Sequence, residues 1–208
     1  MKRVVLITGG ASGLGLATAA ELAKDAGNTV VIASRNMSAV DAAVKKLNSQ
    51  SGRDNVRGLH LDLGSLAGVA AFTKDLTAQF PRVDVLLCNA GVAGVPYTLS
   101  PEGFESTFAT NHLGHLLLID SCLAATPPPS RIVIVSSGTH DPSTHSGAPA
   151  PEWTTTEALA HPQKYDANVA YSSSKLANAM TGKYLARHLD AKTASVARAL
   201  PPPCHTPR

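Results

Sequence analysis

Tyr171 and Lys175 are the two residues whose types and spacing most directly suggest chemistry. They lie four residues apart in 170–177, a stretch that reads as helical, so their side chains share one face of the helix. A phenol holds its proton too tightly to act as a base at neutral pH. An ammonium about 5 Å away stabilises the phenolate by about 3 kcal/mol at an effective dielectric constant of about 20. The pair predicts a tyrosine that exchanges a proton with a substrate oxygen, but Tyr-x-x-x-Lys also arises by chance in many chains.

Two hydroxyl side chains follow an apolar strand further upstream. Residues 131–136 form an unbroken β-prone run that ends in Ser136, and Ser137 comes next. Open α/β sheets bind their ligands at the carboxyl ends of the strands, so both serines are expected at a ligand-binding edge. Asn111 lies in the helical stretch before this strand. The preceding strand ends at the same edge with the polar turn Asn89-Ala90-Gly91.

A glycine-rich turn follows the first strand. It joins the apolar run 3–8 to a helical stretch and reads Thr8-Gly9-Gly10-Ala11-Ser12-Gly13-Leu14-Gly15. Glycines permit a tight turn and a close approach of the backbone to a pyrophosphate, and the N-terminus of the helix offers unpaired N–H groups. The strand-turn-helix context favours a dinucleotide site over a merely flexible turn. The cofactor contacts expected from this turn are Thr8, Gly9, Ser12, Gly13, Leu14 and Gly15.

The residues after the second strand bear on the choice of cofactor. An NAD-binding chain usually carries an acid about 20 residues beyond the glycine turn, where it bonds the ribose hydroxyls. This chain has Arg35 and Asn36 there. A guanidinium can hold a 2′-phosphate through a bidentate, charge-assisted contact. The sequence therefore favours NADP over NAD, and the alternative is that Arg35 is only a solvated surface charge.

Short apolar strands alternate with longer helical stretches along the chain, as in βαβ units. The strands are apolar throughout, which indicates a parallel sheet covered by helices on both faces. We therefore predict an α/β fold: a Rossmann-like doubly wound parallel sheet in three α/β/α layers, with residues 1–208 as one NAD(P)-binding domain. Strands are expected at 3–8, 29–33, 56–61, 83–88 and 131–136, and helices at 14–26, 38–49, 65–79, 101–125 and 168–190. The long interruption 138–168 has the length of a lid or binding loop.

Composition excludes several classes of protein. The chain has 208 residues, of which 44% are hydrophobic and 16% charged, with a net charge of +3, and this describes a globular protein rather than a disordered one. It carries no basic run, so nucleic acid is not an expected partner. No apolar segment approaches the length of a membrane span. The 3 cysteines are odd in number and lack metal-ligand spacing, which indicates reduced thiols and a cytoplasmic protein.

Other catalytic and metal sites are weaker interpretations of the same residues. His112 and His115 are three apart on a helix, but no Cys or Glu partners appear at ligand spacing, so we expect structural or surface roles for them and no metal. Ser137, His140 and Asp141 have the residue types of a hydrolase triad. The chain nevertheless lacks the Gly-x-Ser-x-Gly elbow of such enzymes, so hydrolase chemistry is disfavoured.

Taken together, these motifs resemble the short-chain dehydrogenase/reductase family over about residues 3 to 192. They are the TGxxxGxG turn, Asp62-Leu63, Asn89-Ala90-Gly91, Asn111, Ser137 and the Tyr171/Lys175 pair, in the order of the family. Ser137 and Tyr171 are separated by 34 residues, which is long for the family. With the run Ser136-Ser137-Gly138-Thr139-His140, this separation is similar to the subgroup of retinol dehydrogenase-like and protochlorophyllide reductase-like enzymes.

The resemblance implies an NAD(P)-dependent oxidoreductase that moves a hydride between the nicotinamide and a carbonyl or alcohol carbon. It makes Tyr171 the general acid or base, and it gives Lys175 the tasks of assisting Tyr171 and holding the nicotinamide ribose. It also implies that Ser137, favoured over Ser136, bonds the substrate oxygen and that Asn111 anchors a proton-relay water. Besides the glycine turn, the implied cofactor-binding residues are Asp62, Leu63, Asn89, Ala90, Gly91, Tyr171 and Lys175.

The resemblance fails after the Tyr171 helix. The family supplies a sixth strand, a Pro-Gly turn, a substrate-covering helix and a seventh strand there. This chain offers a short β-prone run at 193–199, then Pro201-Pro202-Pro203, and stops at Arg208. We therefore expect the C-terminal strands of the sheet to be incomplete. We also expect either that the natural gene product is longer or that the terminal residues reflect a truncation or an altered reading frame. A catalytically inactive nucleotide-binding sensor or interaction protein stays the alternative to an active enzyme, and the substrate, the direction of reaction and the oligomeric state are left open.

Overall fold

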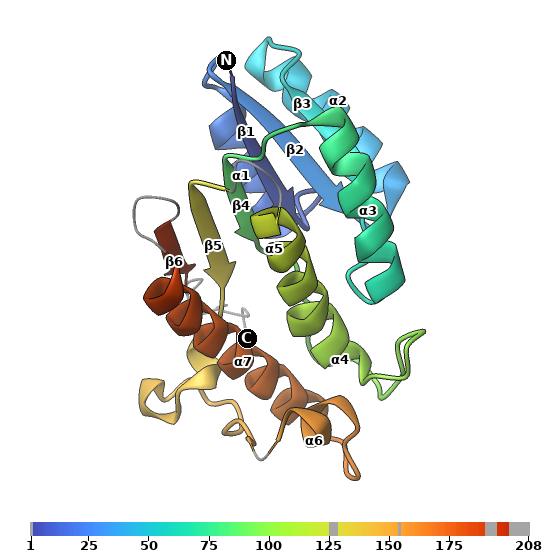
Figure 1. Cartoon of the computed structure of the whole chain (residues 1–208), viewed down its shortest axis with the longest axis vertical. Helices are drawn as coiled ribbons and strands as arrows, with labels where there is room; N and C mark the ends of the chain where they lie inside the picture. The colour runs from blue at the N-terminus through green and yellow to red at the C-terminus, as the bar shows by residue number, and fades with distance from the viewer. Residues whose placement is uncertain (1, 125–128, 154, 190–194, 200–208) are drawn as a thin grey trace, which may run out of the picture.

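Six parallel strands form one sheet in the part of the chain that the computed structural model describes, residues 2–124, 129–153, 155–189 and 195–199 (Figure 1). Their order across the sheet is β3-β2-β1-β4-β5-β6, and every adjacent pair is parallel. The order reverses between β1 and β4, the place where doubly wound sheets bind ligands. The predicted α/β class with a Rossmann-like doubly wound sheet is confirmed. The strands are β1 (Arg3–Thr8), β2 (Asn28–Ser34), β3 (Val56–His60), β4 (Val85–Cys88), β5 (Arg131–Val135) and β6 (Ser195–Ala199).

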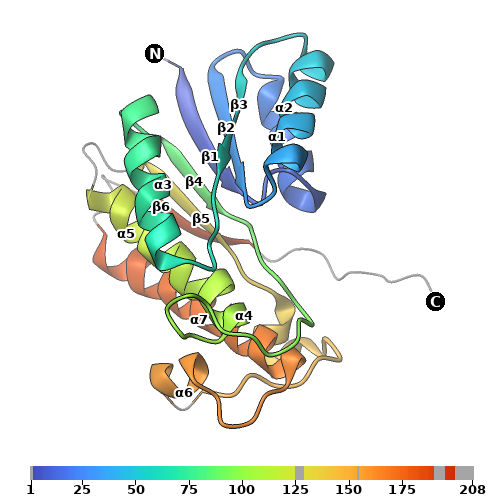
Figure 2. The ribbon, with the colours of Figure 1, turned by 90° about the vertical axis from the view of Figure 1, so that its right-hand side faces the viewer.

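Helices cover both faces of the sheet, which gives the three predicted layers (Figure 2). On β1, Val5 and Ile7 pack into the cluster under the helices of one face, and Leu6 packs into the cluster under the helices of the other face. All three are at most 2% exposed, which is why this strand is apolar throughout. One face carries α1 (Gly13–Ala23) and α2 (Met37–Ser51), and the other carries α3 (Leu66–Gln79), α5 (Gly114–Ala124) and α7 (Ala167–His188).

The helix predicted over 101–125 is wrong at its start. Residues 101–104 form a turn instead, in which Gly103 has a φ of +87° that a right-handed helix does not contain. The first helical segment is the short α4 (Ser106–Phe108). Its start is fixed by Glu105, whose carboxylate accepts hydrogen bonds from the first N–H groups of the helix.

A π-helical turn, η1 (Ala109–Leu113), connects α4 to α5. Within it the N–H of Gly114 donates to the carbonyl of Ala109, five residues back. Such wide turns are rare and occur frequently at functional sites. This one carries Asn111, so the expected site residue lies on a local irregularity rather than on a regular helix.

The long interruption 138–168 is mostly irregular, as predicted, but it contains three short helices: η2 (Gly138–His140), η3 (Pro142–Thr144) and α6 (Thr156–Ala160). The carbonyl of Ala160 accepts the N–H of Glu105 at 2.7 Å, which ties this segment to the start of α4. At the other end of the chain, β6 lies within the β-prone run 193–199. Residues 200–208, with Pro201-Pro202-Pro203, lie outside the described residues.

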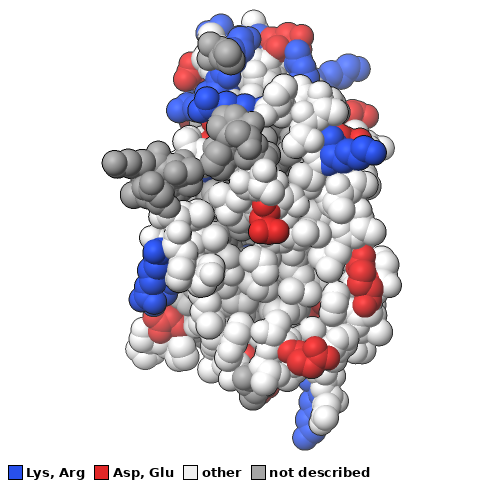
Figure 3. Space-filling model, viewed as in Figure 1, with Lys and Arg blue, Asp and Glu red and all other residues white. Residues whose placement is uncertain are grey.

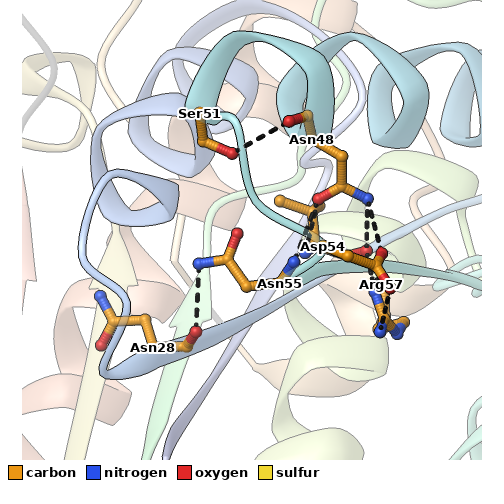
Figure 4. A network of polar contacts seen from close by, with 7 residues as sticks. Asn28, Asn48, Ser51, Asp54, Asn55 and Arg57 are labelled. Carbon is orange, nitrogen blue, oxygen red and sulfur yellow. Dashed lines mark hydrogen bonds and ion pairs between the residues drawn. The ribbon is translucent and has the colours of Figure 1, made fainter.

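A polar network beside the amino ends of β2 and β3 joins these strands to α1 and α2 (Figure 4). The side-chain oxygen of Asn48, on α2, accepts the backbone N–H of Asn55 at 3.2 Å and of Val56 at 2.9 Å. The side-chain nitrogen of Asn55 donates to the carbonyls of Ala23 and Asn28 at 3.1 and 3.2 Å. One asparagine therefore ties α2 to β3, and the other ties the residue before β3 to the end of α1 and the start of β2.

Asn48→Leu is expected to lower the free energy of unfolding by about 2–4 kcal/mol, because two buried backbone N–H groups lose their acceptor. Ser51→Ala is the matched control on α2. The Ser51 hydroxyl makes a 3.3 Å bond to the Asn48 carbonyl, and its loss should cost less than about 1 kcal/mol. Urea unfolding measures both changes, and equal losses would contradict the role given to Asn48.

The face of the molecule seen in Figure 1 carries few charged side chains near its middle, over α5 and α7 (Figure 3). Most of the visible Lys and Arg gather at the end of this face where the chain starts. No continuous basic stripe crosses this face, as a surface that tracks a phosphate backbone would require. Within the described residues, no helix combines the length and the apolar character needed to cross a membrane.

Candidate active site

The turn between β1 and α1 needs glycine at several positions, Gly9, Gly13 and Gly15 among them. Gly9 and Gly13 have φ angles of +68° and +52°, where a residue with a side chain is strained. A Cβ on Gly15 would lie 2.4 Å from the Gly9 carbonyl oxygen and 2.6 Å from the Asn89 amide nitrogen. Backbone conformation therefore explains Gly9 and Gly13, and close packing of α1 on the turn explains Gly15.

The N-terminus of α1 opens beside this turn. Its N-cap residue is Ser12, whose backbone is extended and whose side chain makes no capping hydrogen bond. Ser12, Gly13 and Leu14 are exposed, and a Cβ on Gly13 would meet nothing within 4 Å. A helix N-terminus stabilises an anion through its N–H groups and its dipole. The open turn and this helix end fit the pyrophosphate of a dinucleotide.

A cleft of about 520 Å³ lies at this edge of the sheet. It brings together eleven of the residues expected to bind a cofactor, and Thr8, Gly15, Tyr171 and Lys175 are not among its lining residues. Five further lining residues were not expected at a cofactor site from the sequence, although each is adjacent to an expected residue or to another lining residue. The expected lining residues are Gly9, Ser12, Gly13, Leu14, Arg35, Asn36, Asp62, Leu63, Asn89, Ala90 and Gly91, and the missed ones are Ala33, Ser34, Leu61, Val92 and Thr110.

Arg35 and Asn36 lie where β2 ends and α2 begins. Both are exposed and both line the cleft. Asn36 is also the N-cap of α2, because its side-chain oxygen accepts the N–H of Ala39 at 3.1 Å. Its amide therefore has a structural task, whereas Arg35 places a guanidinium at the cleft. After the neighbouring strand, β3, the Asp62 carboxylate accepts the N–H of Gly64 at 2.9 Å.

Thr8 lies underneath the cleft and joins its two halves. It is fully buried, and its hydroxyl oxygen accepts the backbone N–H groups of Asn89 and Ala90, each at 3.0 Å. The side chain of Asn89 donates back to the Thr8 carbonyl at 2.9 Å. These contacts hold the end of β4 against the end of β1, across the reversal of strand order.

Tyr171 and Lys175 lie one turn apart on α7, whose start is capped by Asp166. The Lys175 Nζ is 5.5 Å from the centroid of the Tyr171 ring and donates to the Val135 carbonyl at 3.3 Å. Only 3% of Lys175 is exposed, and burial lowers its pKa from 10.5 to about 8. Tyr171 is partly exposed, so α7 places a partly exposed tyrosine beside a buried lysine.

Asn111, on η1, ties the loop after β4 to α7. Its side-chain oxygen accepts the N–H of Val92 at 2.8 Å, and its nitrogen donates to the Val92 carbonyl at 2.9 Å. The same nitrogen donates to the Ser174 hydroxyl at 3.0 Å. Asn111 is fully buried, so its side chain has a structural task, which fixes η1 beside the helix that carries Tyr171 and Lys175.

Gly91 lies where the cleft approaches Lys175 of the Tyr171/Lys175 pair. A Cβ built on Gly91 would lie 3.2 Å from the Lys175 Nζ and 3.3 Å from the Asn111 side-chain oxygen. Three segments distant in sequence therefore converge at one point: the turn after β4, η1 and α7. A cofactor that occupied the cleft up to Gly91 would lie next to the amine of Lys175.

The two serines after β5 differ in surroundings. Ser136 is fully buried, and its hydroxyl donates to the Lys175 carbonyl at 2.8 Å, so it holds α7 against the strand. Ser137 is partly exposed, and its oxygen accepts the N–H of Thr139 at 3.3 Å. Of the two serines, Ser137 is therefore the one that is not fully buried.

A second cavity, of about 540 Å³, lies against the first turns of α7, beside α6. Its lining includes Phe108, Leu159, Tyr165 and Ala170 but none of the expected site residues. Its slightly larger volume does not make it the better candidate, because it contains neither the glycine turn nor the Tyr171/Lys175 pair. In the described part of the chain, no three His, Cys, Asp or Glu side chains are grouped as metal ligands.

Comparisons with known proteins agree with this geometry. A family model described as short chain dehydrogenase matches residues 3–148. Retinol dehydrogenase 14 of Mus musculus is 39% identical over 206 residues, which cover 93% of this chain and 59% of that protein. Retinol dehydrogenase 13 of Homo sapiens is 36% identical over 196 residues, with 93% and 56% covered. The chain thus spans less than two thirds of the length of these curated relatives.

Solved structures resemble the fold as well. An uncharacterized protein from Mycobacterium paratuberculosis superimposes with a TM-score of 0.81 at 37% identity, covering 98% of this chain and 69% of that one. A metagenomic short-chain oxidoreductase in complex with NADP superimposes with a TM-score of 0.71 at 24% identity, covering 96% and 81%. The second likeness, at this low identity, concerns the fold alone.

Proposed function

The chain belongs to the short-chain dehydrogenase family, and from this premise we propose that it is an oxidoreductase that acts on a carbonyl or alcohol substrate with a nicotinamide cofactor. The observation that carries the proposal is the convergence at Gly91. There the end of the nucleotide-sized cleft lies beside the Lys175 amine and Asn111. The Tyr171/Lys175 pair and the proposed cofactor site are therefore adjacent.

The cofactor, when bound, supplies or accepts the hydride. Ser12, Gly13 and their neighbours in the glycine turn would hold the pyrophosphate at the N-terminus of α1. Asp62 and Leu63 would bind the adenine end of the cofactor, and Asn89, Ala90 and Gly91 would contact it toward the nicotinamide. Lys175 would bond the nicotinamide ribose, which its position beside Gly91 supports.

Proton transfer falls to Tyr171. In reduction its hydroxyl gives a proton to the substrate oxygen, and in oxidation the phenolate takes that proton back. The Lys175 ammonium favours the phenolate electrostatically, and Ser137 donates a hydrogen bond to the same substrate oxygen. The backbone carbonyl of Asn111, whose side chain is already bonded to Val92 and Ser174, anchors a water through which the proton reaches solvent. The partly exposed Ser137 supports its role better than the buried Ser136 would.

NADP is the proposed form of the cofactor, because Arg35 lines the cleft after β2 and no acid occupies that place. Arg35→Glu is expected to raise the KM for NADPH about 10- to 100-fold, the equivalent of one charge-assisted contact, and to change the KM for NADH little. Lys45→Glu, the same charge reversal at an exposed position of α2, is the matched control. Steady-state kinetics with both cofactors measure the effect, and equal changes for NADPH and NADH in Arg35→Glu would refute the assignment.

The substrate is proposed only as a class, an alcohol or its carbonyl partner. Retinol and its aldehyde belong in the first substrate panel because the curated relatives are named retinol dehydrogenases. We also propose that residues 1–208 act as one nucleotide-binding domain in the cytoplasm. Cys88 and Cys122 are free thiols without a disulfide partner among the described residues, as expected of a protein in a reducing compartment.

A further inference from the structure

His115 is a buried histidine that the proposed chemistry does not use. It lies in the first turn of α5, directly after η1, and is 2% exposed. Its Nε2 is 2.8 Å from the hydroxyl oxygen of Thr8, 107 positions away in sequence. Its Nδ1 is 3.0 Å from the carbonyl oxygen of Asn111. The imidazole therefore bridges the end of β1 and η1 beneath the cleft.

The partners of His115 determine which ring nitrogen carries the proton. The carbonyl of Asn111 can only accept, so Nδ1 must be the donor. Burial lowers the pKa of His115 to about 4; the bond to the Asn111 carbonyl acts in the opposite direction, and the charges of Lys175 and His112 lower the pKa further. The ring is neutral near pH 7, and Nε2 is left as an acceptor.

The tautomer in turn orients the Thr8 hydroxyl. With Nε2 as acceptor, the Thr8 O–H donates to His115, and the Thr8 oxygen keeps its lone pairs for the N–H groups of Asn89 and Ala90. The other possible acceptor of the Thr8 proton, the Leu87 carbonyl, is 3.4 Å away. Every donor has an acceptor in this arrangement, and the opposite tautomer would leave Nδ1 facing a carbonyl without a proton between them.

The start of α5 is fixed against the cleft by a second contact. A Cβ on Gly114 would lie 2.2 Å from the carbonyl oxygen of Leu63, so glycine lets the helix touch the backbone of a cleft-lining residue. His115 is therefore held from one side by this packing and reaches toward β1 from the other. A shift of the imidazole would move the carbonyl of Asn111 relative to Thr8 and the turn after β4.

We propose that His115 is a positioning residue: as the neutral Nδ1–H tautomer it sets the Asn111 backbone of the proposed proton path relative to Thr8 and the Asn89–Ala90 wall of the cofactor cleft. The proposal rests on the proposed function, because both segments serve it. A change far from the reacting atoms that misplaces them by about 1 Å can lower a rate about 100-fold. A buried bridge between η1 and the end of β1 can therefore affect turnover without touching the substrate.

Nuclear magnetic resonance tests the tautomer independently of activity. The chain is labelled with ¹⁵N-histidine, and the His115 signals are identified by their loss in His115→Gln. At neutral pH we expect a protonated Nδ1 and an unprotonated Nε2, with or without NADPH. A protonated Nε2 with a bare Nδ1, or a charged ring, would overturn the proposal even if the enzyme turns over normally.

Kinetics test the positioning role. His115→Leu removes both bonds, and we expect kcat at saturating cofactor to fall about 10- to 100-fold. His115→Asn places an amide nitrogen near the Nδ1 position, so it keeps the bond to Asn111 and should recover part of that loss. It also serves as the test if His115→Leu does not fold. Unchanged kcat and unchanged NADPH dissociation constants in the folded variants would contradict the proposal.

A core variant separates positioning from stability. Phe72→Leu, in the buried cluster under α3, is expected to lower the melting temperature but to leave kcat unchanged well below that temperature. If Phe72→Leu lowers kcat as much as His115→Leu does, the effect of His115 is one of stability and the proposal is wrong. If the wild-type chain turns over no substrate, the proposed function fails. The role of His115 is then decided by its tautomer and by the NADPH dissociation constants of the wild type and the His115 variants.

Discussion

Replacement of Tyr171 by phenylalanine is expected to lower kcat about a thousandfold, with the dissociation constant for NADPH within about twofold of wild type. The variant lacks the single hydroxyl that exchanges a proton with the substrate. The ring that lies 5.5 Å from the Lys175 Nζ is kept, and so is the packing of α7. Tyr171 is not among the residues that line the cleft, so the loss should appear in turnover and not in cofactor affinity.

Tyr184→Phe is the control for this experiment. Tyr184 lies on the same helix and is 61% exposed, and its ring stacks on His188 at a centroid distance of 4.1 Å. The same loss of one hydroxyl should leave kcat and NADPH binding unchanged. A Tyr171→Phe variant that keeps more than a tenth of wild-type kcat would remove the basis for the proposed proton transfer.

The second large effect is expected from Lys175→Met, which should lower kcat/KM about 100-fold. A charge about 5 Å from the phenolate contributes about 3 kcal/mol at an effective dielectric constant of about 20, and that energy corresponds to about two powers of ten in rate. The side chain of methionine fills much of the same volume, so α7 should stay in place. Lys183→Met, at an exposed position of the same helix, is the control and should change nothing. A Lys175→Met variant with wild-type kcat/KM would show that the ammonium does not assist Tyr171.

The pKa of Lys175 gives this prediction a pH dependence. Burial lowers that pKa to about 8, so the side chain is an ammonium below this pH and a neutral amine above it. Substrate reduction that relies on the cation should therefore slow as the pH rises through about 8, and the Met variant should lack that step. A pH profile of kcat/KM for both proteins checks the sign, and the same step in both would contradict the role of the ammonium.

The local motifs were predictable because their chemistry depends on short spacings. The glycine turn could be placed because Gly9, Gly13 and Gly15 follow an apolar strand directly. Tyr171 and Lys175 could be paired because four residues make one turn of helix. The strands were identified from unbroken apolar runs, which burial on both faces explains.

The long-range contacts could not be predicted in the same way. Asn111 was expected in a regular helix, and neither propensity nor pattern distinguishes a π-helical turn from an α-helical one. His115 was expected to be structural or on the surface, but its partner could not be predicted. The bond to Thr8 spans 107 positions, and no spacing rule reaches that far. Thr110 was missed as a cleft residue, although its neighbour Asn111 was expected at the site, because the chain gives no local sign of which face meets the cleft.

In the proposed function, one cleft binds a nicotinamide nucleotide and Tyr171 transfers the proton beside it. The most direct test is a fluorescence titration with NADPH, combined on the same preparation with a turnover assay over aldehydes, ketones and alcohols that include retinol and its aldehyde. We predict that wild type and Tyr171→Phe both bind NADPH and that only wild type turns over a substrate. Binding without turnover by wild type would favour a nucleotide-binding sensor or interaction protein, and an absence of NADPH binding would contradict both the proposed cofactor site and the proposed oxidoreductase function.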